Sequence, residues 1–121
     1  MDNNLFIVGN YINKFNADTG QHLPCGPIYQ SVGLATHVKN HHPENGTSLL
    51  SYVPSIIQAP DYIGKHPTKP DSIELVKNVG NNVMVCIKLD SKNGYLYVAS
   101  VFEISPNKLS NRLNSGRLKK Y

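Results

Sequence analysis

The sequence predicts an α+β fold in which two N-terminal helices precede a twisted antiparallel sheet of about four strands, followed by a basic C-terminal helix or tail. Three observations lead to this class. Apolar residues recur at helical spacing in the first half, apolar and polar residues alternate in the second half, and Asn93-Gly94 marks a hairpin between two alternating runs. At 121 residues, 40% of them hydrophobic, the chain suits one domain with a packed core. We divide it into an N-terminal β arm, a helical part, a sheet and a basic tail, at residues 1–25, 26–60, 61–105 and 106–121.

The N-terminal arm is expected to be extended. Residues 5–15 begin with large apolar side chains and lead into the turn-rich segment 16–20, which is typical of a short hairpin arm or an edge strand. Pro27 is a favourable residue for opening a helix. We therefore predict the first helix over residues 28–42, with apolar residues at mixed spacings of three and four: Ile28, Val32, Leu34, Ala35 and Val38.

A clearer helical stripe follows. Its expected N-cap is Thr47 or Ser48, and one face carries Leu49, Leu50, Val53, Ile56 and Ile57. Pro54 is expected to kink this helix and Pro60 to end it. Three prolines within residues 60–71 then predict a surface connection.

Three strands are predicted over residues 72–78, 82–90 and 95–105, and Ser105 is expected to cap the helix of the basic tail. Each of the last two predicted strands carries a set of alternating apolar residues. A hairpin loop of two or four residues places both sets on the core-facing side of the sheet. A loop of three residues would place them on opposite faces, so we reject a three-residue loop. These sets are Val83, Val85, Ile87 and Leu89, and Leu96, Val98, Ser100, Phe102 and Ile104. The opposite face then gathers a cationic and phenolic patch of Lys88, Asp90, Tyr95 and Tyr97.

The formal net charge of +4 favours an anionic partner such as nucleic acid. The first residues lack the basic and apolar regions of a signal peptide, and no segment approaches the roughly 20 apolar residues of a membrane span. We therefore expect a cytoplasmic protein that acts in the bacterial or host cytosol and has no membrane partner. Taken alone, the patch on the open face is typical of a solvated sheet surface.

Five segments in a fixed order carry a family resemblance. They read GLATHVKNHHP at residues 33–43, YVPSIIQAPDYIG at 52–64, SIELVK at 72–77, VMVCIKLD at 83–90 and GYLYVAS at 94–100. Together they resemble the phage-type nuclease domains grouped with barnase, EndoU, colicin and RelE toxins, the BECR-type nucleases. The pattern of that group is a helix with a histidine near its end, a second helix and an antiparallel sheet, and the similarity spans roughly residues 26–120.

The resemblance implies a phage or toxin-type endoribonuclease that needs no metal and no cofactor. In such an enzyme the 2′-hydroxyl of RNA attacks the adjacent phosphate and leaves a 2′,3′-cyclic phosphate, which requires a base, an acid and a cation. Histidine suits both proton roles. The candidate catalytic residues are His37, His41, His42, Lys88 and Tyr97, with His37 as the first choice and Lys88 as the phosphate partner. The candidate RNA-binding residues are Lys39, Tyr95, Ser100, Arg112 and Arg117.

Several points stay open at this level. The face assignment turns Ser100 toward the core, in conflict with an RNA-binding role, and His22 and His66 lie in loops and receive no role. His37 and His41 stand one helical turn apart, but no Glu or Cys of matching spacing completes a zinc site, so no metal is expected. The alternative function is a catalytically inactive RNA- or protein-binding module on the same scaffold. An inhibitor of another enzyme is a weaker reading, since nothing acidic stands out.

The partner follows from the resemblance and the charge. RNA is expected, either transfer RNA or messenger RNA. If the chain is a toxin, an immunity or antitoxin protein is implied, and carboxylates of that protein would cover the basic open face.

Overall fold

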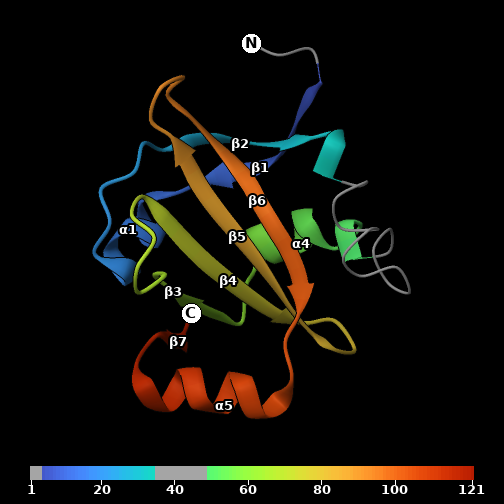
Figure 1. Ribbon diagram of the computed structural model, residues 1–121, viewed down its shortest axis with the longest axis vertical. Coiled ribbons are helices and arrows are strands. Elements are labelled where there is room, and N and C mark those ends of the chain that lie inside the picture. The colour runs from blue at the N-terminus through green and yellow to red at the C-terminus, as the bar shows by residue number, and fades with distance from the viewer. Residues whose placement is uncertain (1–3, 35–48) are drawn as a thin grey trace.

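The computed structural model describes residues 4–34 and 49–121, and those residues form ten helices and strands (Figure 1). In chain order these are β1 (Leu5–Tyr11), α1 (Asn13–Thr19), β2 (Gly26–Ser31), α4 (Val53–Gln58), β3 (Tyr62–Gly64), β4 (Ser72–Asn78), β5 (Asn82–Asp90), β6 (Tyr95–Glu103), α5 (Pro106–Ser115) and β7 (Leu118–Lys120).

All seven strands join one sheet in the order β1-β2-β6-β5-β4-β3-β7. The sheet is mixed, because β2 runs parallel to β6 while every other neighbouring pair is antiparallel. The predicted fold of two N-terminal helices before about four antiparallel strands is therefore wrong. The chain begins its described part with a strand, and the three helices of the described ranges are short. Three strands that sequence patterns did not predict, β2, β3 and β7, extend the sheet on both sides.

The N-terminal prediction is correct for the edge strand and wrong beyond it. Strand β1 lies at the sheet edge, but it ends at Tyr11, and residues 13–19 form α1 instead of extending the strand. Asn16 in α1 links this helix to the end of β1 and to the segment before β2. Its Oδ1 accepts hydrogen bonds from the Tyr11 hydroxyl at 2.8 Å and from the Leu23 N–H at 3.0 Å. Gly20 closes the helix with a φ of 75°, a conformation that glycine adopts at little cost.

The first predicted helix, over residues 28–42, is wrong at its start. Residues 28–31 belong to β2, which pairs on one side with β1 and on the other with β6. Ile28 is fully buried there, so the strand is held by long-range pairing and burial that helical spacing does not reveal. The later part of that segment lies outside the described residues.

The second predicted helix is confirmed in its apolar face and shorter than expected. Helix α4 begins at Val53 with Pro54 in its first turn, where a proline is tolerated, so Pro54 starts this helix and does not kink it. The proposed caps Thr47 and Ser48 lie outside the described residues. Leu49, Val53, Ile56 and Ile57 are all buried.

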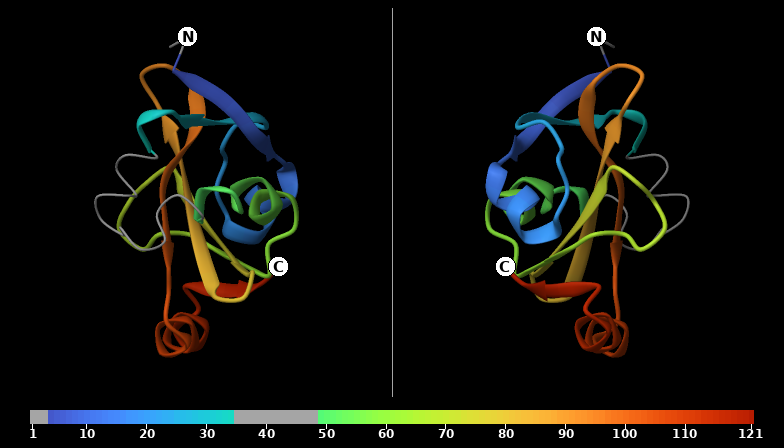
Figure 2. Two further views of the ribbon diagram at one scale, coloured as in Figure 1. Left: turned by 90° about the vertical axis from the view of Figure 1, so that its right-hand side faces the viewer. Right: turned by 90° about the vertical axis from the view of Figure 1, so that its left-hand side faces the viewer.

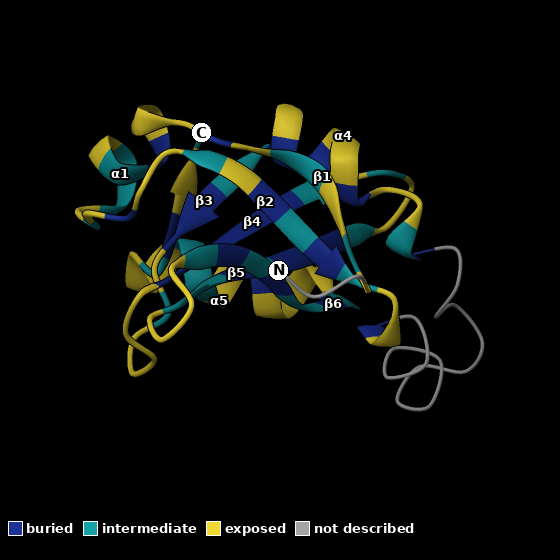
Figure 3. Ribbon diagram, turned by 90° about the horizontal axis from the view of Figure 1, so that it is seen from above, coloured by how far each residue is buried: buried dark blue, intermediate teal, exposed yellow. Residues whose placement is uncertain are grey.

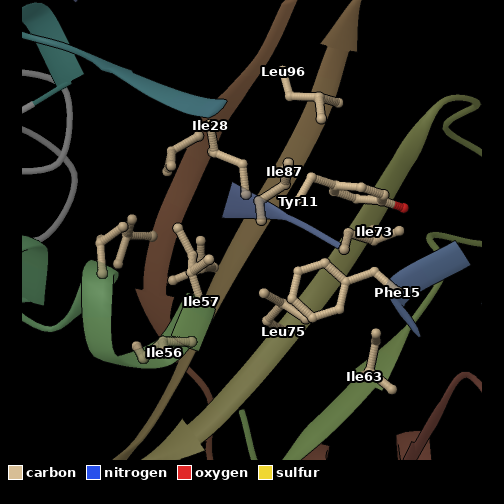
Figure 4. Close-up of a cluster of buried hydrophobic side chains, with 14 of the residues drawn as sticks. Tyr11, Phe15, Ile28, Ile56, Ile57, Ile63, Ile73, Leu75, Ile87 and Leu96 are labelled. Atoms are coloured by element: carbon tan, nitrogen blue, oxygen red, sulfur yellow. The ribbon is translucent and has the colours of Figure 1, made fainter. Parts of the chain in front are cut away.

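Helices α1 and α4 lie on the same side of the sheet (Figure 2). Between them and the sheet is the main core, drawn in Figure 4, where Tyr11 and Phe15 pack edge to face at 5.2 Å between ring centroids. Burial raises the pKa of Tyr11, whose hydroxyl keeps its hydrogen bond to Asn16. Buried residues lie along the strands, while most connections between them are exposed (Figure 3).

The central strands follow the predicted alternation closely. Strands β4 and β5 have the predicted bounds, and β6 begins at the predicted residue. The register pairs Asp90 with Tyr95, so four residues form the hairpin loop and the rejected three-residue loop is absent. Asp90 Oδ2 accepts the side-chain amide of Asn93 at 3.0 Å, and Oδ1 accepts the backbone N–H groups of Lys92 and Asn93 at 3.1 and 3.0 Å. These bonds, led by the one from the Asn93 side chain, lower the pKa of Asp90.

The basic tail is a helix followed by a strand. Ser105 caps α5 as predicted, with its hydroxyl oxygen accepting the Lys108 N–H at 3.1 Å. After Gly116 the chain forms β7, which pairs with β3. The predicted surface connection over residues 60–71 is therefore wrong for β3 and correct for the loop 65–71. None of the described helices is long and apolar enough to cross a membrane.

Candidate active site

The candidate site lies on the face of β4, β5 and β6 that points away from the main core, here called the open face. Cross-strand register divides this face into three rows. One end is packed under α5 and is called the covered end: Val76, Met84 and Phe102. The middle, called the boundary row, holds Glu74, Cys86 and Ser100. The far end, called the open end, carries Ser72, Lys88 and Tyr97.

A β-bulge in β6 aligns these rows. Cys86 pairs with Ser100, but the next residue, Ile87, pairs with Val98, so Ala99 is an extra residue without a cross-strand partner. The extra residue reverses the alternation that follows it. The prediction that Ser100, Phe102 and Ile104 face the main core is wrong for this reason, and Val101 takes the core position instead. The conflict over Ser100 disappears, because it shares a face with Lys88 and Tyr97.

A cavity of about 310 Å³, here called the lysine cavity, opens on this face. Two parts of the chain line it. The strands supply the open end and the boundary row, and the loop 65–71 supplies a wall that includes His66, Thr68 and Lys69. Lys88 and Tyr97 are direct cross-strand neighbours within it. None of the carboxylates in the described parts of the chain forms a salt bridge with Lys88.

The loop 65–71 is ordered by hydrogen bonds within it and is held to the sheet by hydrogen bonds that its backbone carbonyl groups accept. His66 Nδ1 accepts the N–H groups of Thr68 and Lys69, both at 3.1 Å. The Ser72 hydroxyl donates to the Lys69 carbonyl at 3.0 Å, and the Leu89 N–H donates to the Asp71 carbonyl at 2.9 Å. His66 is therefore fixed at the rim of the lysine cavity by a compact turn.

The surroundings of His66 lower its pKa. Partial burial is the largest cause; Glu74 raises the pKa, while the positive charges of Arg117, Lys69 and Arg112 lower it. The two hydrogen bonds accepted by Nδ1 require that nitrogen to be unprotonated, so the proton of the neutral ring resides on Nε2. His66 is thus a positioned N–H donor.

A partly buried ion pair forms the floor beside this cavity. Arg117 donates from Nε to Glu74 Oε1 at 2.8 Å and from Nη2 to Oε2 at 2.7 Å, and the two side chains are 23% and 2% exposed. The pair raises the pKa of Arg117. Both Glu74 oxygens are occupied, so this carboxylate serves as a structural acceptor.

Gly64 allows the ion pair to form. It lies between Glu74 on β4 and Leu118 on β7 in the sheet register. A Cβ atom at this position would collide with the carbonyl oxygen of Arg117, so only glycine lets β7 approach β3 this closely.

Cys86 lies in the boundary row beside Ser100. Burial raises the pKa of its thiol, with a smaller lowering effect from the hydrogen bond with Ser100. The thiol therefore stays protonated at neutral pH and is not a nucleophile.

Most of the predicted site residues with described positions gather on the open face. Lys88, Tyr97 and Ser100 line the lysine cavity, and Tyr95 contacts Tyr97 with ring centroids 6.1 Å apart. Arg112 lies on α5 with Nη1 3.3 Å from the Met84 sulfur, and Arg117 engages Glu74. His37, Lys39, His41 and His42 fall outside the described residues and stay predictions.

Sequence reasoning missed His66 and Glu74. His66 lies in a proline-rich loop without periodicity, so only the folded loop brings it to the cavity. A charged residue inside the apolar strand 72–78 was a usable signal for Glu74, because a buried carboxylate needs a partner. No cluster of three or more His, Cys, Asp or Glu side chains suited to a metal ion occurs in residues 4–34 and 49–121.

Comparison with models of protein families identifies a family for this chain. The model of the family described as phage-Barnase-EndoU-ColicinE5/D-RelE like nuclease3 matches residues 6–111, which is most of the chain. No curated protein and no solved structure matches. The predicted resemblance to phage-associated BECR-type nucleases is confirmed.

Proposed function

The chain belongs to the phage-Barnase-EndoU-ColicinE5/D-RelE like nuclease3 family, and from this premise we propose the reaction that it catalyses. The proposed reaction is cleavage of RNA by attack of a 2′-hydroxyl on the adjacent phosphate, without a metal ion. The observation that carries it is the lysine cavity, which brings together the ammonium group of Lys88, the imidazole of His66 and the hydroxyl groups of Tyr97 and Ser100.

Lys88 is proposed as the cation that binds the phosphate. Its ammonium group has no carboxylate partner among the described residues, and it stands beside Tyr97 and Ser100, whose hydroxyl groups can donate to phosphate oxygens. Negative charge grows on the phosphate oxygens as the 2′-oxygen attacks. A fixed positive charge at this point stabilises the transition state more than the ground state.

His66 is proposed as a neutral donor to the same phosphate. Its Nδ1 is occupied by backbone N–H groups, so in this arrangement the ring offers the Nε2–H. A neutral imidazole with a lowered pKa polarises an oxygen by hydrogen bonding without carrying a full charge. This role differs from that of a general base, which needs an unprotonated nitrogen facing the attacking hydroxyl.

The proton transfers remain assigned to the predicted histidines. A base removes the 2′-hydroxyl proton, the 2′-oxygen forms a bond to phosphorus, and the bond from phosphorus to the 5′-oxygen breaks. An acid then protonates the 5′-oxygen, so the products are a 2′,3′-cyclic phosphate and a 5′-hydroxyl. His37 is the proposed base, and His41 and His42 are the further candidates for proton transfer.

The test uses total RNA, with and without EDTA, and compares wild type with His37→Ala, Lys88→Ala and Lys92→Ala. Lys92 lies in the exposed hairpin loop and is a matched control for loss of one positive charge. We expect cleavage by wild type and Lys92→Ala, with 2′,3′-cyclic ends, and loss of cleavage by the other two. Activity that EDTA abolishes contradicts the metal-free reaction. Binding of RNA without any cleaved product favours the inactive binding module.

A further inference from the structure

Three tyrosine side chains form a continuous row on the open face. The parallel register of β2 and β6 pairs Tyr29 with Tyr97, while the adjacent pair, Ile28 and Leu96, is buried in the main core. Tyr29 and Tyr97 therefore point away from that core, and Tyr95 lies two residues before Tyr97 on the same face. Ring centroids are 5.8 Å apart for Tyr29 and Tyr95 and 6.1 Å apart for Tyr95 and Tyr97, both edge to face.

A second cavity lies at one end of this row. It has a volume of about 720 Å³ and is here called the tyrosine cavity. Its walls include the two tyrosine rings at that end, one proline before β2, one proline within β2 and a hairpin-loop amide: Tyr29, Tyr95, Pro24, Pro27 and Asn93. Tyr97 at the other end of the row lines the lysine cavity. The ring contact between Tyr95 and Tyr97 thus connects the two cavities.

The two cavities differ in charge. The lysine cavity includes the ammonium groups of Lys88 and Lys69, and its one carboxylate, Glu74, is paired with Arg117. No charged residue is among the described residues that line the tyrosine cavity. A phosphate needs positive charge or several N–H donors, so the tyrosine cavity suits a neutral and flat group. Aromatic faces with a few polar groups at the edge are the environment in which proteins hold unpaired nucleobases.

We propose that the tyrosine cavity binds an unpaired nucleobase of the RNA strand whose phosphate lies at Lys88, so that the substrate is single-stranded RNA. This inference rests on the proposed function for the position of the phosphate. Stacking on Tyr29 or Tyr95 needs a base whose faces are free. In an RNA duplex each base is stacked on its neighbours and its edge is paired, so a duplex cannot fill this cavity without unpairing.

The test measures binding and not cleavage. The probe is a short fluorescent oligonucleotide with 2′-O-methyl groups on every ribose, which cannot undergo 2′-hydroxyl attack, used as a single strand and as a duplex with its complement. Dissociation constants come from anisotropy at fixed salt. The variants are Tyr29→Ala, Tyr29→Leu and Tyr29→Phe. Tyr52→Ala is the matched control, because Tyr52 is an exposed tyrosine at the start of α4, on the opposite side of the sheet.

We expect wild type to bind the single strand more tightly than the duplex. Tyr29→Ala and Tyr29→Leu should weaken single-strand binding about 5-fold to 100-fold, since aromatic stacking contributes on that scale. Tyr29→Phe keeps the ring and should stay within about threefold of wild type. Tyr29→Leu keeps a large apolar side chain but has no ring, so its loss of binding reports the missing aromatic face. Thermal unfolding checks that each variant is folded.

The outcomes separate this inference from the proposed reaction. Equal binding of single strand and duplex, or an effect of Tyr29→Leu no larger than that of Tyr52→Ala, overturns the tyrosine cavity as a base site. Neither result bears on cleavage of natural RNA by wild type. Conversely, absence of cleavage together with a loss of single-strand binding in Tyr29→Leu overturns the proposed reaction and supports the base site.

Discussion

The two ends of the open face are built on the same three strands and have opposite character. At the covered end, Val76, Met84 and Phe102 pack under α5 with Leu109 and Leu118. At the open end, Ser72, Lys88 and Tyr97 surround a cavity of about 310 Å³. Each strand thus changes from apolar to polar along one face within four or five residues.

The two ends of the sheet therefore differ in role: the covered end contributes to stability, and the open end carries the polar groups proposed to act in catalysis. The covered end anchors the last helix of the described chain, and removal of apolar surface from water favours that arrangement. The open end keeps polar groups beside a space that a substrate can enter. The boundary row separates the two, and its buried Glu74 is paired by Arg117 from the segment between α5 and β7.

Loss of the ion pair in the boundary row should cause the largest loss of stability. Arg117→Ala leaves a carboxylate that is 2% exposed without its partner, and we expect a loss of about 3–5 kcal/mol in the free energy of unfolding, measured by urea denaturation. Lys119→Ala is the control, because Lys119 is an exposed neighbour. The double variant Glu74→Met with Arg117→Met should recover much of the loss, since no buried charge remains. Equal effects of Arg117→Ala and Lys119→Ala would show that the pair does not stabilise the boundary.

The covered end should respond in stability alone. Met84→Ala removes a fully buried side chain beneath α5 and should cost about 2–5 kcal/mol in the free energy of unfolding. RNA cleavage per folded molecule should stay near the wild-type rate, because Met84 does not line the lysine cavity. Calorimetry and a cleavage assay well below the melting temperature separate the two quantities. A large fall in cleavage by the folded variant would contradict the division between the ends.

The open end should respond in activity alone. Lys88→Ala should lower the rate constant of cleavage by about 10²–10³-fold, since it removes the cation proposed to stabilise the transition state. Its thermal unfolding temperature should stay close to that of wild type, because Lys88 is only partly buried. Lys92→Ala is the matched control and should retain cleavage. A comparable fall in both variants would indicate a general effect of charge on RNA affinity.

The cap of α5 should have a smaller effect on the covered end. Ser105→Ala removes the acceptor for the Lys108 N–H and should cost about 1 kcal/mol in the free energy of unfolding. Ser105→Asp keeps an acceptor and should be close to wild type. If Ser105→Ala has no effect, helix capping does not contribute to the anchoring of α5.

The smallest effect is expected in the pH dependence of the loop 65–71. The folded state lowers the pKa of His66, so its contribution to stability is present above the unfolded pKa of about 6.5 and is lost as the pH falls through the folded-state pKa. Protonation of Nδ1 would break both hydrogen bonds from Thr68 and Lys69. His66→Asn supplies a side-chain oxygen that accepts the same N–H groups and does not titrate. The unfolding temperature of wild type, relative to that of His66→Asn, should fall as the pH drops through the folded-state pKa of His66. If the unfolding temperatures of the two proteins change in parallel with pH, the role of Nδ1 is contradicted.

Local patterns predicted the central strands and missed the elements around them. Strands β4 and β5 were predicted at their observed bounds because alternation over seven to nine residues reports burial of one face. Strand β2 was expected to be helical, because its pairing with β6 joins residues far apart in the chain. The bulge at Ala99 left a signal in the adjacent apolar pair Val101 and Phe102, which strict alternation does not explain.

The sequence by itself determined the alternating strands, their hairpin, the cap of α5 and the presence of Lys88, Tyr95 and Tyr97 on one face. These features depend on contacts between residues close in the chain, where spacing and side-chain type decide the conformation. Only the tertiary structure decided that Ser100 joins that face, that His66 reaches the cavity and that Arg117 pairs with Glu74. These depend on a bulge, a folded loop and a sheet edge, whose positions follow from burial summed over the whole fold.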